Sequence, residues 1–317
     1  MGDAVCAISV DMDAVGCYTK IHGLAAHRGD DPIYHAALER LLSLFRSFGV
    51  RATFFVVGDD VEDPQHAALL RGVVAQGHEV ANHSRRHVYD LPRLGWAGIH
   101  EEIAGAQDQI ERACGIRPVG FRAPGYNVSD EVLDCLEALN FAYDSSVFPS
   151  PPYYVAKALA MALIRLRGRK SGSAMVDART QLTPLRPYLP RAGAIFRRGR
   201  GQTRRALVEL PICVLPCSRF PVIGTSLILA GPRWAPFLLQ RAMSFHRSFL
   251  GLELHGIDLA DPAKDGYTEA LCQAQPDLRH SIERKEETMK RSLEMLARHY
   301  RFVTCREAAL QVSQQML

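Results

Sequence analysis

The stretch Gly-His-Glu-Val-Ala-Asn-His-Ser-Arg-Arg-His at residues 77–87 places two histidines, His83 and His87, just after a short apolar run that is typical of a strand. The histidines are four residues apart, about one helical turn, so we expect both imidazoles to face one point in space. Neutral imidazoles that converge suit a divalent metal, most commonly zinc. The same spacing also arises by coincidence on helix surfaces, so this pair alone does not decide between a metal site and an ordinary helix.

Polar side chains end two further strand-like segments. Asp11 and Asp13 follow the apolar run at residues 5–10, and positions two apart in an extended chain share a face, so both carboxylates can point into one site. His255 ends the segment at residues 252–254. Each group has a plainer alternative, since the aspartates can form a turn and His255 can be a hydrogen-bonded core residue. Two histidines with one carboxylate are nevertheless a known zinc ligand set with a position left open for water.

The composition is that of an ordinary globular protein. The 317 residues are 47% apolar and 23% charged, which suits one large α/β domain or two small ones. No run reaches the length of about 18 apolar residues that a membrane span needs, and the start of the chain lacks the pattern of a signal peptide. The eight cysteines form no Cys-x-x-Cys pair, which favours buried thiols in a reducing compartment. We therefore expect a cytoplasmic protein.

Strand-like and helix-like segments alternate along the chain at intervals of about 25–35 residues. We expect strands at residues 5–10, 51–57, from 79, from 120, and at 141–144, 207–211, 252–255 and 300–304, and helices at residues 33–48, 64–76, 94–114, 130–139, 234–249 and 279–299. This alternation predicts a parallel βα arrangement, in which functional groups gather at the carboxyl ends of the strands. All of the polar groups described above lie at such ends.

The alternation breaks after residue 149, and the segment that follows is strongly basic. Residues 156–205 carry thirteen Lys or Arg against the single acid Asp177, a charge of +12 in a chain whose total is +4. A charge this lopsided indicates an anionic neighbour, such as lipid headgroups, a phosphorylated ligand or nucleic acid. Residues 153–166 are mostly apolar, helical in propensity and too short to span a bilayer.

Five motifs, taken in order, resemble the polysaccharide deacetylase family, also called the NodB-homology family or carbohydrate esterase family 4. They are Ser9-Val10-Asp11-Met12-Asp13, His83-Ser84-Arg85-Arg86-His87, Arg122-Ala123-Pro124-Gly125, Asp144-Ser145-Ser146 and Leu252-Glu253-Leu254-His255. The resemblance covers residues 5–148 and about 207–305. It implies an α/β fold, a distorted (β/α) barrel of about seven parallel strands. We interpret residues 1–317 as a single domain of this kind, with a basic insertion at residues 150–206 after the fifth strand.

Two departures from the family pattern affect the site. Met12 separates aspartates that are adjacent in the commonest pattern, which resembles the branch with peptidoglycan deacetylase-like and allantoinase-like members. The tryptophan that usually ends the fourth motif is absent, because Val147-Phe148-Pro149 follows instead. The acid that orients His255 is therefore left open, and Asp258, three residues further on, is the local candidate.

The resemblance also implies a role for each motif residue. Asp13, His83 and His87 would bind a divalent metal, most often Zn²⁺, with Co²⁺, Ni²⁺ or Mn²⁺ as alternatives; the metal would provide the nucleophile and stabilise charge. Asp11 would act as general base, held ionised by Arg122, and His255 as general acid. A backbone N–H at Gly125 or Tyr126 would contribute to an oxyanion site. Asp144 and Asp258 are further candidates near the substrate.

Three functions remain open on these observations. The first is a metal-dependent hydrolase that removes an N-acyl group, acetyl or formyl, from an amino sugar, including a lipid-linked or phosphate-bearing one. The second keeps the chemistry but acts on a non-sugar amide or ureide, as allantoinase-like relatives do, and the third is a non-catalytic binding module. We expect residues 153–205 to contact an anionic membrane surface, which would place the protein at the inner face of the membrane. The plainer alternative is a packed helix with a solvated basic loop. Few aromatics are interleaved with the charges, so we expect no nucleic acid partner.

Overall fold

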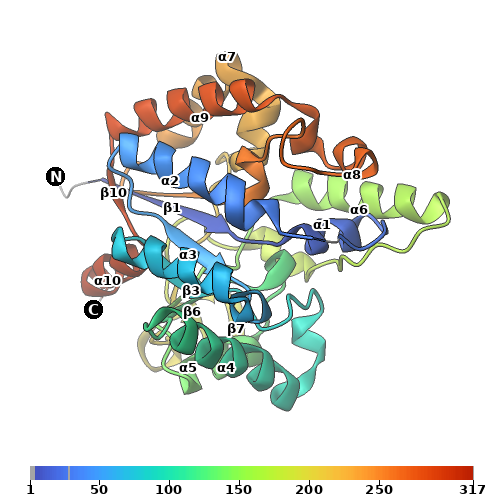
Figure 1. The fold of residues 1–317 in the computed structure, drawn as a ribbon. Coiled ribbons are helices and arrows are strands. Elements are labelled where there is room, and N and C mark those ends of the chain that lie inside the picture. Colours follow the sequence, from blue (N-terminus) through green and yellow to red (C-terminus); the bar gives the residue numbers. More distant parts are fainter. Residues whose placement is uncertain (1–3, 28, 317) are drawn as a thin grey trace.

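The computed structural model describes residues 4–27 and 29–316. In this part of the chain, eight parallel strands form one curved sheet at the centre of the protein (Figure 1). The strands are β1 (Val5–Asp11), β2 (Thr53–Val56), β3 (Glu79–Asn82), β4 (Gly120–Phe121), β5 (Tyr143–Asp144), β8 (Val208–Glu209), β9 (Phe249–His255) and β10 (Arg301–Val303). Residues 1–3, on which the expected absence of a signal peptide partly rests, lie outside the described residues.

The strand order is that of an incompletely closed barrel. Seven strands follow one another as β9-β1-β2-β3-β4-β5-β8, all in parallel register, and β10 pairs with the first three residues of β1. Beyond β8 the chain reaches β9 through a hydrogen bond from the Cys213 N–H to the Gly251 carbonyl, 3.0 Å long. The predicted distorted (β/α) barrel of about seven strands is confirmed.

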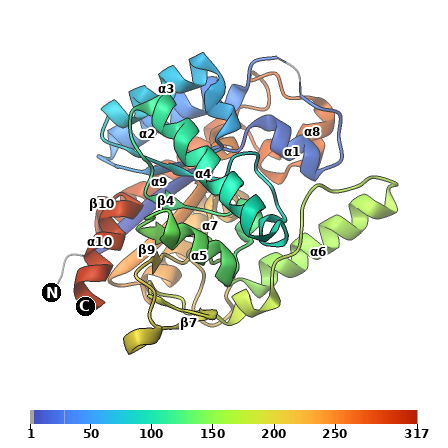
Figure 2. The same ribbon diagram turned by 90° about the horizontal axis from the view of Figure 1, so that it is seen from below.

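Helices form the outer layer of this barrel (Figures 1 and 2). The α-helices are α1 (Val15–Ile21), α2 (Leu38–Ser47), α3 (Pro64–Ala75), α4 (Gly95–Cys114), α5 (Asp130–Ala138), α6 (Pro151–Leu166), α7 (Gly224–Met243), α8 (Glu269–Ala274), α9 (Ile282–Ala297) and α10 (Cys305–Met316). Their ends follow from the local sequence: the Ser129 hydroxyl accepts a hydrogen bond from the Val132 N–H at the start of α5, and Gly115 ends α4 with a φ of 72°.

Four of the described helices differ from the expectations. The helix expected at residues 234–249 is α7, which begins ten residues earlier at Gly224 and ends at Met243, while Phe249 already belongs to β9. The first half of α7 was not predicted, because Gly231 and Pro232 are residues that normally end a helix. In the structure Gly231 takes a φ of 74° and the helix continues beyond this break. Helices α1, α8 and α10 were not expected at all.

The insertion lies between β5 and β8, where it was predicted. It contains α6 and an antiparallel hairpin of β6 (Pro190–Arg191) and β7 (Ala194–Arg198). Helix α6 projects from the end of the molecule opposite the two termini (Figures 1 and 2). The charge of one basic residue of the insertion is neutralised within the protein, since the buried Arg205 forms ion pairs with Asp130, Asp134 and Glu137 of the α5 region. Over residues 4–27 and 29–316, no helix combines the length and apolar character that crossing a membrane requires.

Candidate active site

A cavity of about 850 Å³ opens at the carboxyl ends of the barrel strands. Asp11 and Asp13, which come from the end of β1, line it and are buried. Met12 between them is fully buried in the hydrophobic core, because successive side chains of an extended chain point to opposite sides. The extra residue that separates the aspartates therefore puts both carboxylates on the cavity side, as the spacing predicted.

His83 also lines this cavity and His87 lies beside it against Asp13, but the helical turn predicted between the two histidines is wrong. They lie in a loop after β3, in which Ser84 and His87 have φ angles of 62° and 53°. The Asn82 side chain causes the turn: its Oδ1 accepts the Ser84 N–H at 2.8 Å, while its Nδ2 donates to the Ile103 carbonyl. A side-chain acceptor at this position competes with helix formation and folds the loop back instead.

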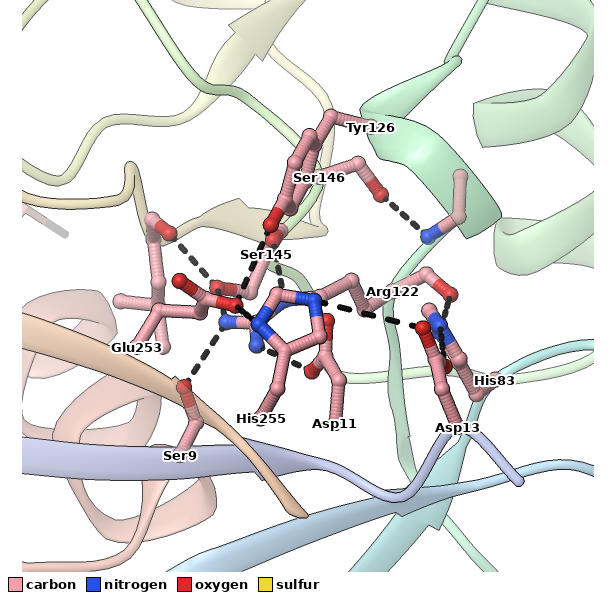
Figure 3. A network of polar contacts seen from close by, with 12 residues as sticks. Ser9, Asp11, Asp13, His83, Arg122, Tyr126, Ser145, Ser146, Glu253 and His255 are labelled. Carbon is pink, nitrogen blue, oxygen red and sulfur yellow. Dashed lines mark hydrogen bonds and ion pairs between the residues drawn. The ribbon is translucent and has the colours of Figure 1, made fainter. Parts of the chain in front are cut away.

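The Asp13 carboxylate lies beside the His83 imidazole (Figure 3). The His87 imidazole completes a compact cluster with these two residues. Asp13 Oδ1 lies 3.3 Å from His83 Nε2 and 3.1 Å from His87 Nε2. The His83 Nδ1 is 2.7 Å from the Arg122 carbonyl, an arrangement in which Nδ1 donates and the neutral ring keeps a lone pair on Nε2. Although burial opposes ionisation, the two histidines hold the pKa of Asp13 well below its usual range.

These three residues fit a divalent metal. Asp13 Oδ1 and His87 Nε2 are both buried and have no hydrogen-bond partner among the described residues, an arrangement that costs free energy unless something else satisfies them. One carboxylate oxygen and two imidazole nitrogens are also the donors that zinc takes in open hydrolytic sites. A second cluster of Asp11, Glu253 and His255 fits a metal less well, because a hydrogen bond already engages one oxygen of each carboxylate.

Arg122, from the loop after β4, holds Asp11 in place. Its Nη1 lies 2.6 Å from Asp11 Oδ1, while Nε donates to the Ser145 carbonyl and Nη2 to the hydroxyls of Ser9 and Ser145. The guanidinium also stacks over the Phe55 ring, 4.2 Å from its centroid. A buried arginine with this many partners is rigid, so it fixes the position of the Asp11 carboxylate.

His255 faces the cavity from the end of β9, and its partner is Glu253 rather than Asp258 (Figure 3). The His255 Nδ1 lies 2.8 Å from Glu253 Oε1, while Nε2 points towards the metal cluster, 4.0 Å from Asp13 Oδ2. Burial opposes a charged imidazole, but Glu253 raises the pKa of His255 well above its usual value. Sequence reasoning missed Glu253, although it lies two residues before His255 on one strand and so shares its face.

The role expected of Asp258 needs correction for this reason. Its Oδ2 accepts the backbone N–H of His255 at 2.9 Å, so it fixes the main chain at the end of β9 without reaching the ring. Burial, together with the nearby Asp277, raises the pKa of Asp258 well above its usual range. Asp258 is absent from the described residues that line the cavity.

Gly125 and Tyr126 both line the cavity, in a turn with φ angles of 61° and 65°. The Tyr126 N–H donates to the Ala123 carbonyl at 2.9 Å, and its hydroxyl donates to Glu253 Oε1 at 3.1 Å. A Cβ on Gly125 would come within 2.7 Å of the Tyr89 ring, so only glycine fits here without displacing that ring. Of the two expected oxyanion donors, the Gly125 N–H is therefore the better candidate.

Asp144 lies behind the site rather than in it. It is fully buried, accepts a hydrogen bond from the Ser146 hydroxyl at 2.6 Å, and is not among the described cavity-lining residues. Burial and the adjacent Asp144 carboxyl raise the pKa of Glu209 well above its usual value. The Ser146 hydroxyl in turn accepts the Ala123 N–H, so Asp144 supports the loop that carries Arg122.

Comparison with known proteins agrees with this geometry. Residues 30–143 match the family model described as polysaccharide deacetylase. This stretch includes His83, His87 and Arg122, which the structure brings together with Asp11 and Asp13. Residues 30–143 are thus similar to the polysaccharide deacetylase family.

Sequence relatives carry deacetylase names but match only part of their length. The chain is 38% identical over 107 residues to the chitooligosaccharide deacetylase of Sinorhizobium fredii, which covers 33% of this chain and 46% of that protein. It is 29% identical over 113 residues to the peptidoglycan-N-acetylglucosamine deacetylase of Bacillus cereus, 36% of this chain and 50% of that protein. The matches thus span about half the length of these relatives.

One solved structure shares the architecture over the whole chain. A crystal structure described as a putative polysaccharide deacetylase from Mycobacterium smegmatis superimposes with a TM-score of 0.61 and covers 100% of this chain and 93% of its own. Its sequence identity is 18%, so the comparison shows that the deacetylase barrel is shared and says nothing further about substrate.

Proposed function

We propose that the protein is a metal-dependent hydrolase that removes an N-acyl group, acetyl or formyl, from an amino sugar. The observation that carries the proposal is the juxtaposition of three units within one cavity. They are the Asp13, His83 and His87 cluster, the Asp11–Arg122 ion pair and the Glu253–His255 pair. Hydrolysis of an amide needs a Lewis acid, a base and an acid, and these units supply one of each.

The chain's own residues divide the work as follows. Asp11, fixed by Arg122, accepts the proton of the attacking water as general base. His255 carries a proton on Nε2 because Glu253 holds the ring charged, and it delivers this proton to the departing nitrogen. The Gly125 N–H faces the oxygen of the tetrahedral intermediate. Asp13, His83 and His87 would hold the metal, which would supply the Lewis acid for water activation and for polarisation of the amide carbonyl.

An amino-sugar substrate is favoured over the two alternatives. The sequence relatives are named for the deacetylation of chitooligosaccharides and of peptidoglycan N-acetylglucosamine, which supports a sugar rather than a ureide. A non-catalytic module has no reason to keep a buried Asp11 paired with arginine and a buried Glu253 paired with His255, since burying charged pairs is costly for stability.

We further propose that the substrate is linked to a lipid and that the insertion rests on an anionic membrane surface. Helix α6 presents the exposed apolar side chains of Val155, Leu159 and Leu163. The α6 basic cluster, which we define as Arg165, Arg167, Arg169 and Lys170, follows at its exposed end. An apolar helix with a basic end suits the interface of an anionic bilayer, where each basic residue contributes about 1 kcal/mol.

A screen of substrates tests the proposed activity. The purified protein, loaded with Zn²⁺, is incubated with extracted lipid-linked sugars and with nucleotide sugars, and the products are followed by mass spectrometry. Removal of acetyl or formyl lowers a substrate mass by about 42 or about 28 units, and an Asp11→Asn variant should produce no such species because it lacks the general base. A ureide that is opened while no sugar loses an acyl group would overturn the proposal.

A further inference from the structure

The catalytic cavity continues into an apolar cleft between two helices, α6 and α7. The cleft, which we call the α6–α7 cleft, is lined by Ala156, Ala160 and Ile164 of α6 and by Leu229, Trp234 and Leu238 of α7. Ala156 and Ala160 are four residues apart and therefore lie on one face of α6. Their small side chains leave the space that larger residues would fill. The same cavity contains Asp13 and His255, so the cleft opens directly from the reaction centre.

The walls of the α6–α7 cleft are apolar, whereas a sugar chain binds to polar side chains that can form hydrogen bonds with its hydroxyls. Trp234 and Phe237 on α7 are 67% and 50% exposed, and Leu229 is 47% exposed. Exposed apolar surface on this scale, gathered at a site rather than scattered, marks a binding surface. Sugar hydroxyls buried between such walls would lose their hydrogen bonds to water without replacement. A hydrocarbon chain loses nothing there and gains about 0.8 kcal/mol for each buried methylene.

Lys157 lies where the apolar cleft meets the catalytic end. It lines the same cavity, and its Nζ is 3.5 Å from the position that a Cβ on Gly125 would occupy. The part of the chain that the structure describes offers Lys157 no ion pair or hydrogen bond. Burial lowers the pKa of Lys157 to about 8. A half-buried ammonium beside the reaction centre that has no protein partner is suited to an anionic ligand.

We propose that the α6–α7 cleft binds the hydrocarbon chain of a lipid-linked amino sugar and that Lys157 binds the phosphate between sugar and lipid. This deepens the proposed function and rests on it. The order of groups along the cavity matches the order in such a lipid: the N-acyl sugar lies at Asp13 and His255, the phosphate at Lys157, and the chain between α6 and α7. The outer face of α6 and the α6 basic cluster would meanwhile face the membrane from which the lipid is drawn.

A binding experiment on Trp234 tests this directly. The chain has two tryptophans, Trp96 and Trp234, so a Trp96→Phe background leaves the cleft tryptophan as the sole reporter. Dodecyl phosphate brominated at the chain end should quench Trp234 fluorescence with saturation. Ala160→Phe should weaken this binding by about tenfold or more by filling the cleft, whereas Ala158→Phe, on the same helix but outside the cavity lining, should not.

The phosphate contact has its own control. Lys157→Met should weaken binding of the brominated dodecyl phosphate by about tenfold, the usual scale for loss of a charge-assisted contact, and leave brominated dodecanol unaffected. Lys290→Met, which changes an exposed lysine on α9, should change neither. Absence of saturable quenching would overturn the inference. A second result would also overturn it: brominated anionic vesicles and brominated dodecyl phosphate each quench wild type and Ala160→Phe to the same extent. Trp234 would then report only contact with the membrane.

Failure of this inference and failure of the proposed function give different results. One outcome is that the alkyl phosphate fails to quench Trp234 while the protein still deacylates a soluble chitooligosaccharide in an Asp11-dependent way. In that case only the assignment of the α6–α7 cleft to a lipid chain is wrong. If alkyl phosphate binds as described and no N-acyl sugar, lipid-linked or soluble, loses its acyl group, the proposed chemistry is wrong and the cleft is a lipid-binding site.

Discussion

Replacing Glu253 by glutamine should shift the pH dependence of the reaction, because Glu253 keeps the His255 imidazole protonated. The carboxylate lies 2.8 Å from Nδ1, and it is the main group that raises the pKa of His255 against the effect of burial. A hydrogen bond to a charged group is worth about 1.5–3 kcal/mol, and one pKa unit corresponds to about 1.4 kcal/mol. Loss of the negative charge should therefore lower the pKa of His255 by roughly one to two units.

The sign of the effect follows from the role of His255. A general acid works only while protonated, so activity falls as the pH rises through its pKa. In Glu253→Gln the alkaline limb of the kcat/KM profile should move to lower pH by about one to two units, with turnover at neutral pH reduced about 10- to 100-fold. The metal content should not change, because Glu253 does not contact the Asp13, His83 and His87 cluster.

Asp258→Asn is the matched control, since Asp258 is the acid that sequence reasoning favoured. Burial and Asp277 raise the pKa of Asp258, which favours the uncharged carboxyl that asparagine resembles in shape. The amide oxygen can still accept the His255 N–H. The alkaline limb should stay where it is in wild type. An alkaline limb that moves in Asp258→Asn and stays in place in Glu253→Gln would refute the assignment of Glu253.

Three further results are expected. His83→Ala should abolish stoichiometric metal binding, measured by elemental analysis, whereas His299→Ala, at an exposed position just after α9, should retain it. Full metal occupancy in His83→Ala would contradict the metal assignment. Lys157→Met should raise the free energy of unfolding at pH 7, by up to about 3 kcal/mol for a pKa of about 8 against an unfolded value of about 10.4, because folding no longer buries a charge. This gain should vanish above about pH 10.5, where the lysine is neutral in both states, and urea unfolding at both pH values checks it. Wild type should sediment with anionic vesicles at low salt and less at high salt, while a variant with the α6 basic cluster changed to Gln should stay in solution; wild type that ignores the vesicles would contradict membrane docking.

Much of the fold could be predicted because its signals are local. The expected helices at residues 64–76, 94–114 and 130–139 match α3, α4 and α5 within a residue or two, since apolar periodicity and flanking caps mark each one. Helix α7 was misplaced because the chain continues through Gly231, which local rules treat as a stop. The two halves of α7 are held together by packing against α9, and this contact between distant segments cannot be read from the local sequence.

The candidate site was predictable as a set of residues but not in its details. Alternation along β1 placed Asp11 and Asp13 together, and the same argument applied to β9 would have found Glu253 beside His255. The loop that carries His83 and His87 was mistaken for a helical turn, because the controlling hydrogen bond comes from the Asn82 side chain. The α6–α7 cleft joins segments about 70 residues apart in sequence, so only the fold brings it next to the reaction centre.

Acyl release by metal-free and zinc-reloaded protein tests the central claim most directly. Protein dialysed against a chelator should release no acetate or formate from its N-acyl sugar, and stoichiometric Zn²⁺ should restore the reaction. Asp11→Asn, which leaves the Asp13, His83 and His87 cluster intact, should take up the same Zn²⁺ and remain slower by on the order of 100-fold or more. Acyl release that persists in the chelated protein, or that proceeds at the wild-type rate in zinc-loaded Asp11→Asn, would contradict a metal-dependent hydrolase with Asp11 as its base.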